Sequence, residues 1–486
     1  MTTSIRQLQP QALWSYFADL NAVPRPSKKE ERVIEFMKNF GESLGLSTHV
    51  DKMGNVIIKK PATQGMEDRQ TMALQSHLDM VHQKNADTNF DFSSEGIKMQ
   101  VNDDWVKAEG TTLGADNGIG VASIMAILAS KDIPHPPIEA LFTIDEETGM
   151  TGAQGLEEGL LDASIMLNLD TEDDTELTIG CAGGIDVTGS GEYDPVACPS
   201  GGAYYKVGVK GLTGGHSGMD IHLGRGNANK LMNRLLSKAS RDYHIRISNI
   251  DGGGLRNAIP RESFAIVAMS SVNAKPFEEY IMSQQEVFKN EYHVTDPDIN
   301  ITLEHVDKPE TLMSNKFQKK LLRAVYAIPN GIYRMDPSIP GLVQTSNNLA
   351  RVLVKDGEYK IMCLTRSSVD TEKMDEAHAI KSALKLMGAD VEFAGSYPGW
   401  TPKPDAPIVH LMSDLYREMY NGEPDVNACH AGLECGIIGN HYPNMDMISF
   451  GPNIRGAHSP DEKVQISSVQ KFWEFLLETL KRTPKK

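Results

Sequence analysis

The chain has 486 residues, 40% hydrophobic and 23% charged, and its 48 basic and 65 acidic residues give a formal net charge of −17. A chain of this length predicts roughly two to four domains. The acidic balance argues against nucleic acid as a partner, because phosphates are neutralised by Lys and Arg.

The sequence also indicates where the protein resides. The longest apolar run, residues 121–129, is too short for a bilayer crossing of roughly 20 residues, so no membrane segment is expected. Residues 1–6 lack the basic stretch and apolar core of a signal peptide. The five cysteines are scattered and contain no Cys-x-x-Cys pair, which is typical of a reducing compartment. We therefore expect a cytoplasmic protein.

The first 190 residues predict alternating helices and strands. Leu13, Trp14, Phe17 and Leu20 share one helical face, and Ser27 with Glu30 predicts a capping box that opens a second helix. A further helix is expected at 118–130. Apolar runs predict strands at 55–59, 71–76, 138–144, 164–169 and 176–179. This alternation is typical of an α/β layer with helices on both faces of a sheet.

The pattern changes at about residue 204. Two similar series of helix, strand, strand, helix and strand are expected, and Asp356-Gly357 predicts a tight hairpin in the second. After about residue 395 the α/β pattern returns, with helices at 408–420 and 467–481 around a strand at 445–450. We therefore expect a discontinuous α/β domain, with a central mixed sheet flanked by helices, interrupted by an inserted α+β domain. The predicted boundaries are 1–190 and 396–486 for the first domain and 191–395 for the second.

Side chains suited to metal binding follow several of the predicted strands. His77 and Asp79 end one strand, Glu146 and Glu147 end another, and Asp170 ends a third. Ligands of open α/β sheets bind beyond the carboxyl ends of the strands, so these side chains are expected at one edge. A lone Asp at a strand end is usually a turn residue, but this co-location favours a common site.

Two further residues belong with this edge. Asp116 lies in Gly-Ala-Asp-Asn-Gly, which precedes the 118–130 helix and lacks the lysine and spacing of a phosphate loop. His458 lies in the loop after the strand at 445–450, and is the best candidate for a remaining ligand. A lone loop histidine is usually a surface residue, so His458 depends on the other motifs.

Imidazole and carboxylate ligands suit zinc, manganese or cobalt. Asp116, Glu147 and Asp170 carry three negative charges, which two divalent ions and one bridging hydroxide would neutralise. Of Glu146 and Glu147, one is expected to be a ligand and the other a general base. The sequence therefore predicts two metal ions.

The motifs together resemble the di-zinc aminoacylase/carboxypeptidase-type metallopeptidases, and the resemblance extends over essentially the whole chain. It is carried by the residues above and by Gly214-Gly215-His216-Ser217-Gly218. Finer matches are 180–184, 255–260, 397–400 and 430–435. The family implies that His77 and Asp170 hold one Zn²⁺, that Glu147 and His458 hold the other, and that Asp116 bridges them. Cobalt or manganese would accept the same ligands.

The resemblance also implies roles for residues outside the ligand set. Asp79 would fix the tautomer of His77, and Glu146 would move protons between water and the leaving amine. His216 would stabilise the oxyanion. Arg366 would bind the substrate carboxylate, with help from Asn257.

The inserted domain would serve as a lid and as a dimerisation surface, so a homodimer is expected. The implied activity is hydrolysis of dipeptides with broad specificity, including substrates with histidine second, such as β-alanyl-histidine. An N-acyl-amino-acid amidohydrolase and a carboxypeptidase remain alternatives with the same chemistry. A two-metal phosphoesterase and a catalytically inactive scaffold are more distant ones.

Overall fold

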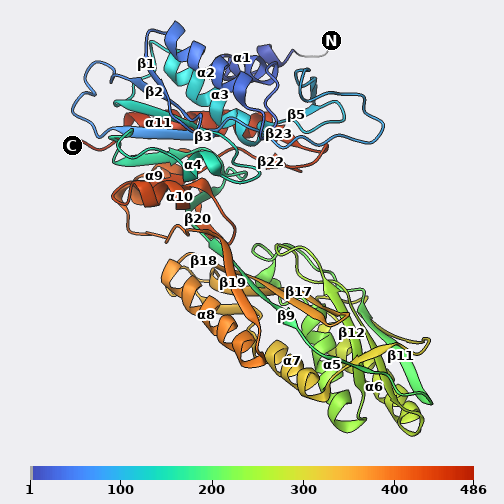
Figure 1. Cartoon of the computed structure of the whole chain (residues 1–486). Coiled ribbons are helices and arrows are strands. Elements are labelled where there is room, and N and C mark those ends of the chain that lie inside the picture. Colours follow the sequence, from blue (N-terminus) through green and yellow to red (C-terminus); the bar gives the residue numbers. More distant parts are fainter. Residues whose placement is uncertain (1–3) are drawn as a thin grey trace. The chain divides into compact units, whose positions relative to one another are not determined.

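The computed structural model describes residues 4–486, which form two compact units (Figure 1). The first unit contains the described residues up to Gly180, together with Trp400–Ala428 and Leu433–Lys486. The second contains Cys181–Gly399 and Cys429–Gly432. The chain therefore leaves the first unit after Gly180, returns to it at Trp400, and leaves it again only for the four residues Cys429–Gly432.

An eight-stranded sheet forms the centre of the first unit, in the order β1-β2-β6-β3-β7-β21-β8-β20. Its strands are β1 Ser47–Val50, β2 Val56–Lys60, β3 Met72–His77, β6 Ile138–Thr143, β7 Ile165–Asn168, β8 Glu176–Cys181, β20 Asp425–Cys429 and β21 Asp446–Ser449. Strands β6, β3, β7 and β21 are mutually parallel, whereas β1 and β2 pair antiparallel. The expected mixed sheet is confirmed, and four parallel strands end at one edge.

Helices cover this sheet. Figure 1 shows three of them together over one face: α1 Gln11–Asn21, α2 Glu31–Ser43 and α3 Ala115–Ala129. The predicted apolar face of α1 is fully buried, and α3 packs on β3. The other helices of this unit are η1 Ile5–Gln7, α4 Thr151–Gln154, α9 Pro407–Tyr420, α10 Glu434–His441 and α11 Ile466–Lys481. Of these, α9 packs on β21 and α11 on α9.

A small sheet, in the order β22-β23-β5-β4, joins the end of the chain to an early segment. Its strands are β4 Met99–Asn102, β5 Trp105–Ala108, β22 Ile454–Arg455 and β23 Lys463–Gln465. The loop between β22 and β23, which carries His458, therefore starts and ends on strands that are fixed against β5.

The capping box predicted for α2 is wrong. The Ser27 hydroxyl donates to the Asp79 carboxylate at 2.7 Å, and Glu30 accepts from the backbone N–H of Lys28. Neither side chain caps the helix, which begins at Glu31. Ser27 instead donates to a buried carboxylate, and a hydrogen bond to an ionised acceptor is stronger than one between neutral groups.

The second unit is built on a nine-stranded antiparallel sheet, in the order β14-β11-β13-β12-β17-β18-β9-β19, with β16 also paired to β17. Its strands are β9 Gly183–Glu192, β11 Gly202–Lys210, β12 Arg246–Gly253, β13 Ser263–Ser270, β14 Asn300–His305, β16 Gly331–Met335, β17 Val343–Lys355, β18 Glu358–Ser367 and β19 Asp390–Tyr397. A separate pair consists of β10 Pro195–Ala197 and β15 Thr311–Met313. The helices are η2 Ile221–Leu223, α5 Ala228–Asp242, η3 Ser271–Asn273, α6 Ala274–Tyr292, α7 Asn315–Ala327 and α8 Asp370–Met387.

Two similar series make up most of this unit. The first is α5-β12-β13-α6-β14, and the second is α7-β17-β18-α8-β19 with β16 added after α7. The predicted hairpin joins β17 and β18 through Asp356 and Gly357, whose φ angles of 53° and 88° suit a tight turn.

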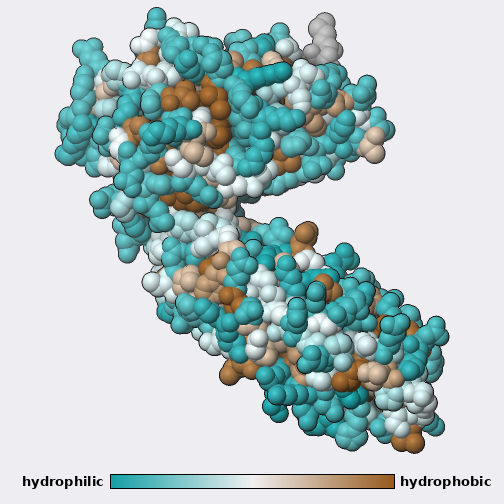
Figure 2. Space-filling view, in the orientation of Figure 1, coloured by the Kyte–Doolittle hydropathy of each residue, from teal (hydrophilic) through white to brown (hydrophobic). Residues whose placement is uncertain are grey.

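Within residues 4–486, no helix is both long and apolar enough to cross a membrane. The face shown in Figure 2 is largely hydrophilic on both units, with hydrophobic residues in small patches.

Candidate metal centre

Five side chains with metal-binding atoms meet at the carboxyl edge of the parallel strands. His77 is the last residue of β3, Glu147 follows β6, and Asp170 follows β7. Asp116 lies in the first turn of α3, and His458 lies in the loop between β22 and β23. Parallel pairing of β3 with β6 and β7 aligns the strand ends, so the sheet itself brings His77, Glu147 and Asp170 together.

Asp116 lies between the two histidines. His77 Nε2 is 3.1 Å from Asp116 Oδ1 and 3.4 Å from Asp170 Oδ1. His458 Nε2 is 3.3 Å from Asp116 Oδ2 and 2.9 Å from Glu147 Oε2. The two oxygens of one carboxylate therefore face two different clusters, which contain one histidine and one further carboxylate each.

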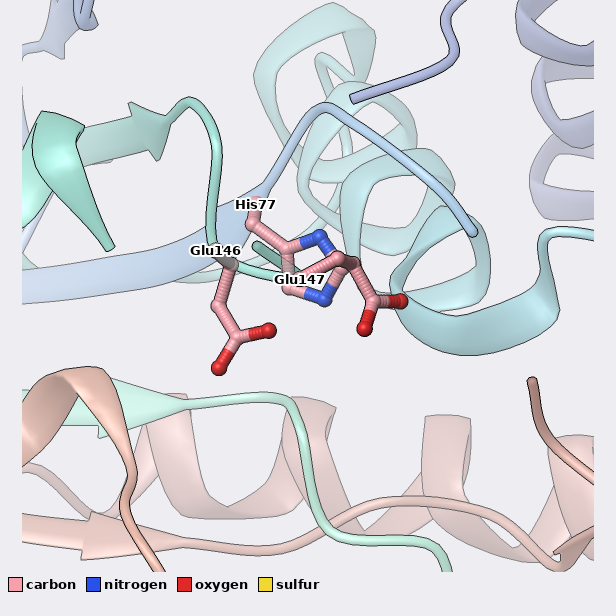
Figure 3. Close-up of side chains that lie close together, drawn as sticks. All are labelled: His77, Glu146 and Glu147. Atoms are coloured by element: carbon pink, nitrogen blue, oxygen red, sulfur yellow. The ribbon is translucent and has the colours of Figure 1, made fainter. Parts of the chain in front are cut away.

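Glu146 and Glu147 follow β6 in the same loop and lie beside His77 (Figure 3). Ligand atoms of these three residues lie within 4.8 Å of one another. The Asp79 carboxylate accepts from the backbone N–H of Glu146 at 3.0 Å and of Glu147 at 3.3 Å. Asp79 thus fixes the backbone that carries both glutamates.

Asp79 also lies next to His77. The His77 Nδ1 atom is 3.2 Å from the backbone oxygen of Asp79 and 3.5 Å from its carboxylate. Either acceptor favours a proton on Nδ1, which leaves Nε2 free to bind a cation.

Glu462 fixes the loop that carries Asp116. This buried carboxylate accepts backbone N–H groups from four successive residues, at 2.7 Å from Leu113, 2.9 Å from Gly114, 2.7 Å from Ala115 and 3.3 Å from Asp116. Because Glu462 lies four residues after His458, one short segment supplies a candidate ligand and positions another.

The buried side chain of Arg25 connects the segment after β3 with the loop that carries Asp116. The Arg25 guanidinium donates to the backbone oxygens of Leu78 and Asp79 at 3.0 Å each and of Gly114 at 2.6 Å. Gly114 has a φ of 70°, and a Cβ there would lie 2.5 Å from Arg25 Nη2, so a side chain at this position would displace the arginine. Burial lowers the pKa of Arg25 to about 10, against the opposing effect of Glu462 and other carboxylates, so it remains charged.

The electrostatics of the cluster favour added positive charge. Hydrogen bonds to Asp116 and Glu147 raise the pKa of His458 to about 11. Burial raises the pKa of Asp170 and of Glu147, and neighbouring carboxylates add to the rise. These raised pKa values show that the site holds more negative charge than its histidines neutralise.

The donor set fits two divalent cations. Oxygen and imidazole nitrogen are common ligands of zinc, cobalt and manganese. Glu147 Oε1 is buried and has no hydrogen-bond partner among the described residues, as expected of an atom reserved for a cation. The groups His77–Asp116–Asp170 and Asp116–Glu147–His458 each bring their ligand atoms within 4.8 Å.

Three residues predicted to contact substrate lie in the second unit. His216 Nδ1 accepts backbone N–H groups from Gly218 at 3.2 Å and Met219 at 3.0 Å, so the proton of the neutral ring is on Nε2. Nε2 lies 3.4 Å from Arg366 Nη2. Asn257 is exposed, and its backbone oxygen accepts from the N–H of Ser217. The structure thus brings His216 and Arg366 together in the same unit.

Sequence reasoning missed the residues that support the site. Glu462 could have been suspected from its position four residues after His458, but Arg25 carries no such signal. Glu434 lies in the quoted 430–435 motif and is fully buried, accepting from Gln75 and Thr143 at 2.7 and 2.6 Å.

Comparison with known proteins identifies the family. Residues 73–482 match Peptidase family M20/M25/M40. The chain belongs to this family. It is therefore a hydrolase of peptide bonds, and the resemblance inferred from the sequence motifs is confirmed.

Two relatives are similar to this member of the M20/M25/M40 family over its whole length. The cytosol non-specific dipeptidase of Escherichia coli is 43% identical over 484 residues, which cover 100% of both chains. The crystal structure of an aminoacylhistidine dipeptidase from Vibrio alginolyticus is 44% identical and matches with a TM-score of 0.95, covering 100% of this chain and 99% of that one. Aminopeptidase PepT from Bacillus cereus, at 17% identity and a TM-score of 0.57 over 98% of each chain, shares the fold.

Proposed function

We propose that the chain is a two-metal dipeptidase of broad specificity, which includes dipeptides with histidine second such as β-alanyl-histidine. The observation that carries the metal site is the position of Asp116, whose two oxygens face His77 and His458 separately. His77 and Asp170 would hold one cation, Glu147 and His458 the other, with Asp116 shared between them. Zn²⁺ is the proposed metal, and Co²⁺ or Mn²⁺ accept the same ligands.

Two divalent cations there would polarise the scissile carbonyl and lower the pKa of water. Glu146 acts on the protons: it takes one from the attacking water and delivers it to the leaving amine. Burial raises the pKa of Glu146 well above its ordinary range, a rise to which Asp170 and Glu434 add and which His77 opposes. A carboxylate with a raised pKa holds the transferred proton more readily than an exposed one.

His216 and Arg366 are the proposed anion-binding groups. With the His216 proton on Nε2, two N–H donors face each other 3.4 Å apart and cannot bond to one another. Such a pair is suited to a shared anionic acceptor. Arg366 is buried and makes no ion pair with any of residues 4–486, and its Nε has no partner there. We assign Arg366 to the substrate carboxylate, His216 to the oxyanion and Asn257 to a supporting contact.

The dipeptide as substrate rests on the two full-length relatives, which are both named dipeptidases. We propose a cytoplasmic location, in keeping with the name of the Escherichia coli relative. A homodimer, in which the second unit serves as lid and dimerisation surface, is proposed from the sequence resemblance alone.

A substrate panel tests this function. Purified chain loaded with zinc is given free dipeptides, tripeptides, N-acetyl amino acids and a phosphodiester. We expect cleavage of dipeptides, β-alanyl-histidine among them, and far slower cleavage of every other class. Faster cleavage of N-acetyl amino acids would support an amidohydrolase instead, and cleavage of longer peptides from the carboxyl end would support a carboxypeptidase.

A further inference from the structure

A groove of about 650 Å³ lies on the second unit, away from the residues assigned above. It is formed by the end of α5, the start of β12 and one side of α7. Among its lining residues are Ser237, Arg241, Arg246, Lys319 and Arg323. This volume is within the range of small-molecule sites in proteins.

The groove is basic in a protein of net charge −17. Four permanent cations line it, together with His244, and no carboxylate does. Arg241 is paired with Asp242 at 2.8 Å, but Lys319 and Arg323 form no ion pair with any of residues 4–486. They lie four residues apart on α7, where like charges face each other and destabilise the helix. A bound anion would remove that cost.

Two polar atoms in the lining residues lack partners. Arg246 is half-buried, and its guanidinium donates to the backbone oxygen of Met313, yet its Nε is buried without a partner among the described residues. The Ser237 hydroxyl is likewise buried without one. An N–H and an O–H without acceptors, beside three exposed cations, suit a ligand that offers several oxygens.

We propose that this groove binds a small molecule that carries a phosphate group. A phosphate presents several oxygens and nearly two negative charges on one centre, which matches the guanidinium forks of Arg246 and Arg323 and the ammonium of Lys319. The volume leaves room for an organic group attached to the phosphate. The ligand differs from the dipeptide in charge and lies on other residues, so the site is independent of the proposed function.

Calorimetric titration of the full chain, loaded with zinc, with adenosine 5′-monophosphate tests this site. The double variant K319Q/R323Q removes two cations from the groove. The matched control K316Q/K320Q removes two cations from the same helix that do not line it. We expect saturable binding, weakened at least about tenfold in K319Q/R323Q through the loss of charge-assisted hydrogen bonds, and changed less than about twofold in the control.

Hydrogen–deuterium exchange locates the ligand. We expect protection of residues 237–246 and 315–326 on binding, and its loss in K319Q/R323Q. Absence of saturable binding, equal weakening in both variants, or full binding by K319Q/R323Q would each overturn the proposal; the last would place the anion elsewhere, metal ions included. Tighter binding of malonate than of the nucleotide would overturn the assignment to phosphate.

Discussion

The buried carboxylate of Glu462 accepts a 2.7 Å hydrogen bond from the backbone N–H of Ala115, the residue before Asp116. The same carboxylate accepts from three further N–H groups of that loop. Asp116 is thereby positioned by a residue 346 places further along the chain, in the segment that also carries His458. Both sides of the proposed metal centre depend on this one anchor.

Replacement of Glu462 by glutamine should weaken metal binding. The amide keeps one acceptor oxygen but turns an N–H₂ group toward backbone donors, so the Asp116 loop loses its fixed position. Loss of a group that orients metal ligands typically costs about 10–100-fold in affinity or activity. Zinc affinity measured against a competing chelator should fall by this factor, and activity should recover at saturating zinc.

The control for this variant is D461N, which neutralises the exposed neighbour of Glu462. It should leave zinc affinity unchanged within about twofold, since surface charges contribute little. Equal effects of E462Q and D461N would contradict the anchoring role.

Glu146 and Glu147 should differ when each is changed to glutamine. E146Q should keep two zinc ions per chain but lose about 10²–10⁴-fold in kcat, because proton transfer is removed. E147Q should lose metal, because a proposed ligand is removed. Zinc content by atomic emission, measured beside kcat, separates the two outcomes. Loss of metal in E146Q with retention in E147Q would reverse the assignment.

Arg366 should set the requirement for a free carboxylate. R366M should raise the KM of a free dipeptide at least about tenfold, the loss expected for a charge-assisted contact. The KM of the corresponding dipeptide amide, which has no carboxylate, should be nearly unchanged. If both substrates lose equally, Arg366 acts on the structure of the second unit rather than on the substrate.

Glu376 on α8 should make stability depend on pH. It is fully buried with neither oxygen hydrogen-bonded within the described part of the chain, and burial raises its pKa to about 8 from an ordinary 4.5. The folded state therefore binds a proton that the unfolded chain releases between these values. Its contribution is complete below pH 4.5 and is lost as pH rises toward 8.

E376Q should therefore raise the melting temperature at pH 8 relative to the unaltered chain. About 1 kcal/mol corresponds to about 2–4 °C for a domain of this size, and we expect a gain of at least about 4 °C. The gain should shrink toward pH 5. E279Q, an exposed glutamate on α6, is the control and should leave the pH profile unchanged. If the melting temperature of E376Q changes with pH in parallel with that of the unaltered chain, Glu376 is not the titrating group.

Local patterns were sufficient for most of the fold. The apolar runs located the strands β3, β6 and β7 to within one residue of their observed bounds. Their carboxyl ends predicted a shared edge, which the parallel pairing of β3, β6 and β7 explains. Short strands such as β4, β22 and β23 were missed, because pairing with distant segments stabilises them rather than their own sequence.

The residues that position the candidate ligands were harder to predict than the ligands themselves. Ser27 was assigned to a helix cap from its spacing, yet it donates to Asp79, 52 residues away. Arg25 binds backbone groups, which leave no sequence pattern to recognise, and Glu462 is marked only by its closeness to His458 in the chain. Candidate ligands are detectable because their residue types are restricted by chemistry, whereas such anchors depend on tertiary structure.

The central claim is that this constellation holds two metal ions for dipeptide hydrolysis. It is tested most directly by measuring β-alanyl-histidine cleavage and zinc content in one sample, before chelation, after it, and during stepwise return of zinc. We predict that activity disappears with the metal and returns to a plateau at two zinc ions per chain. Undiminished cleavage by the metal-free chain, or none by folded chain carrying two zinc ions, would contradict the account.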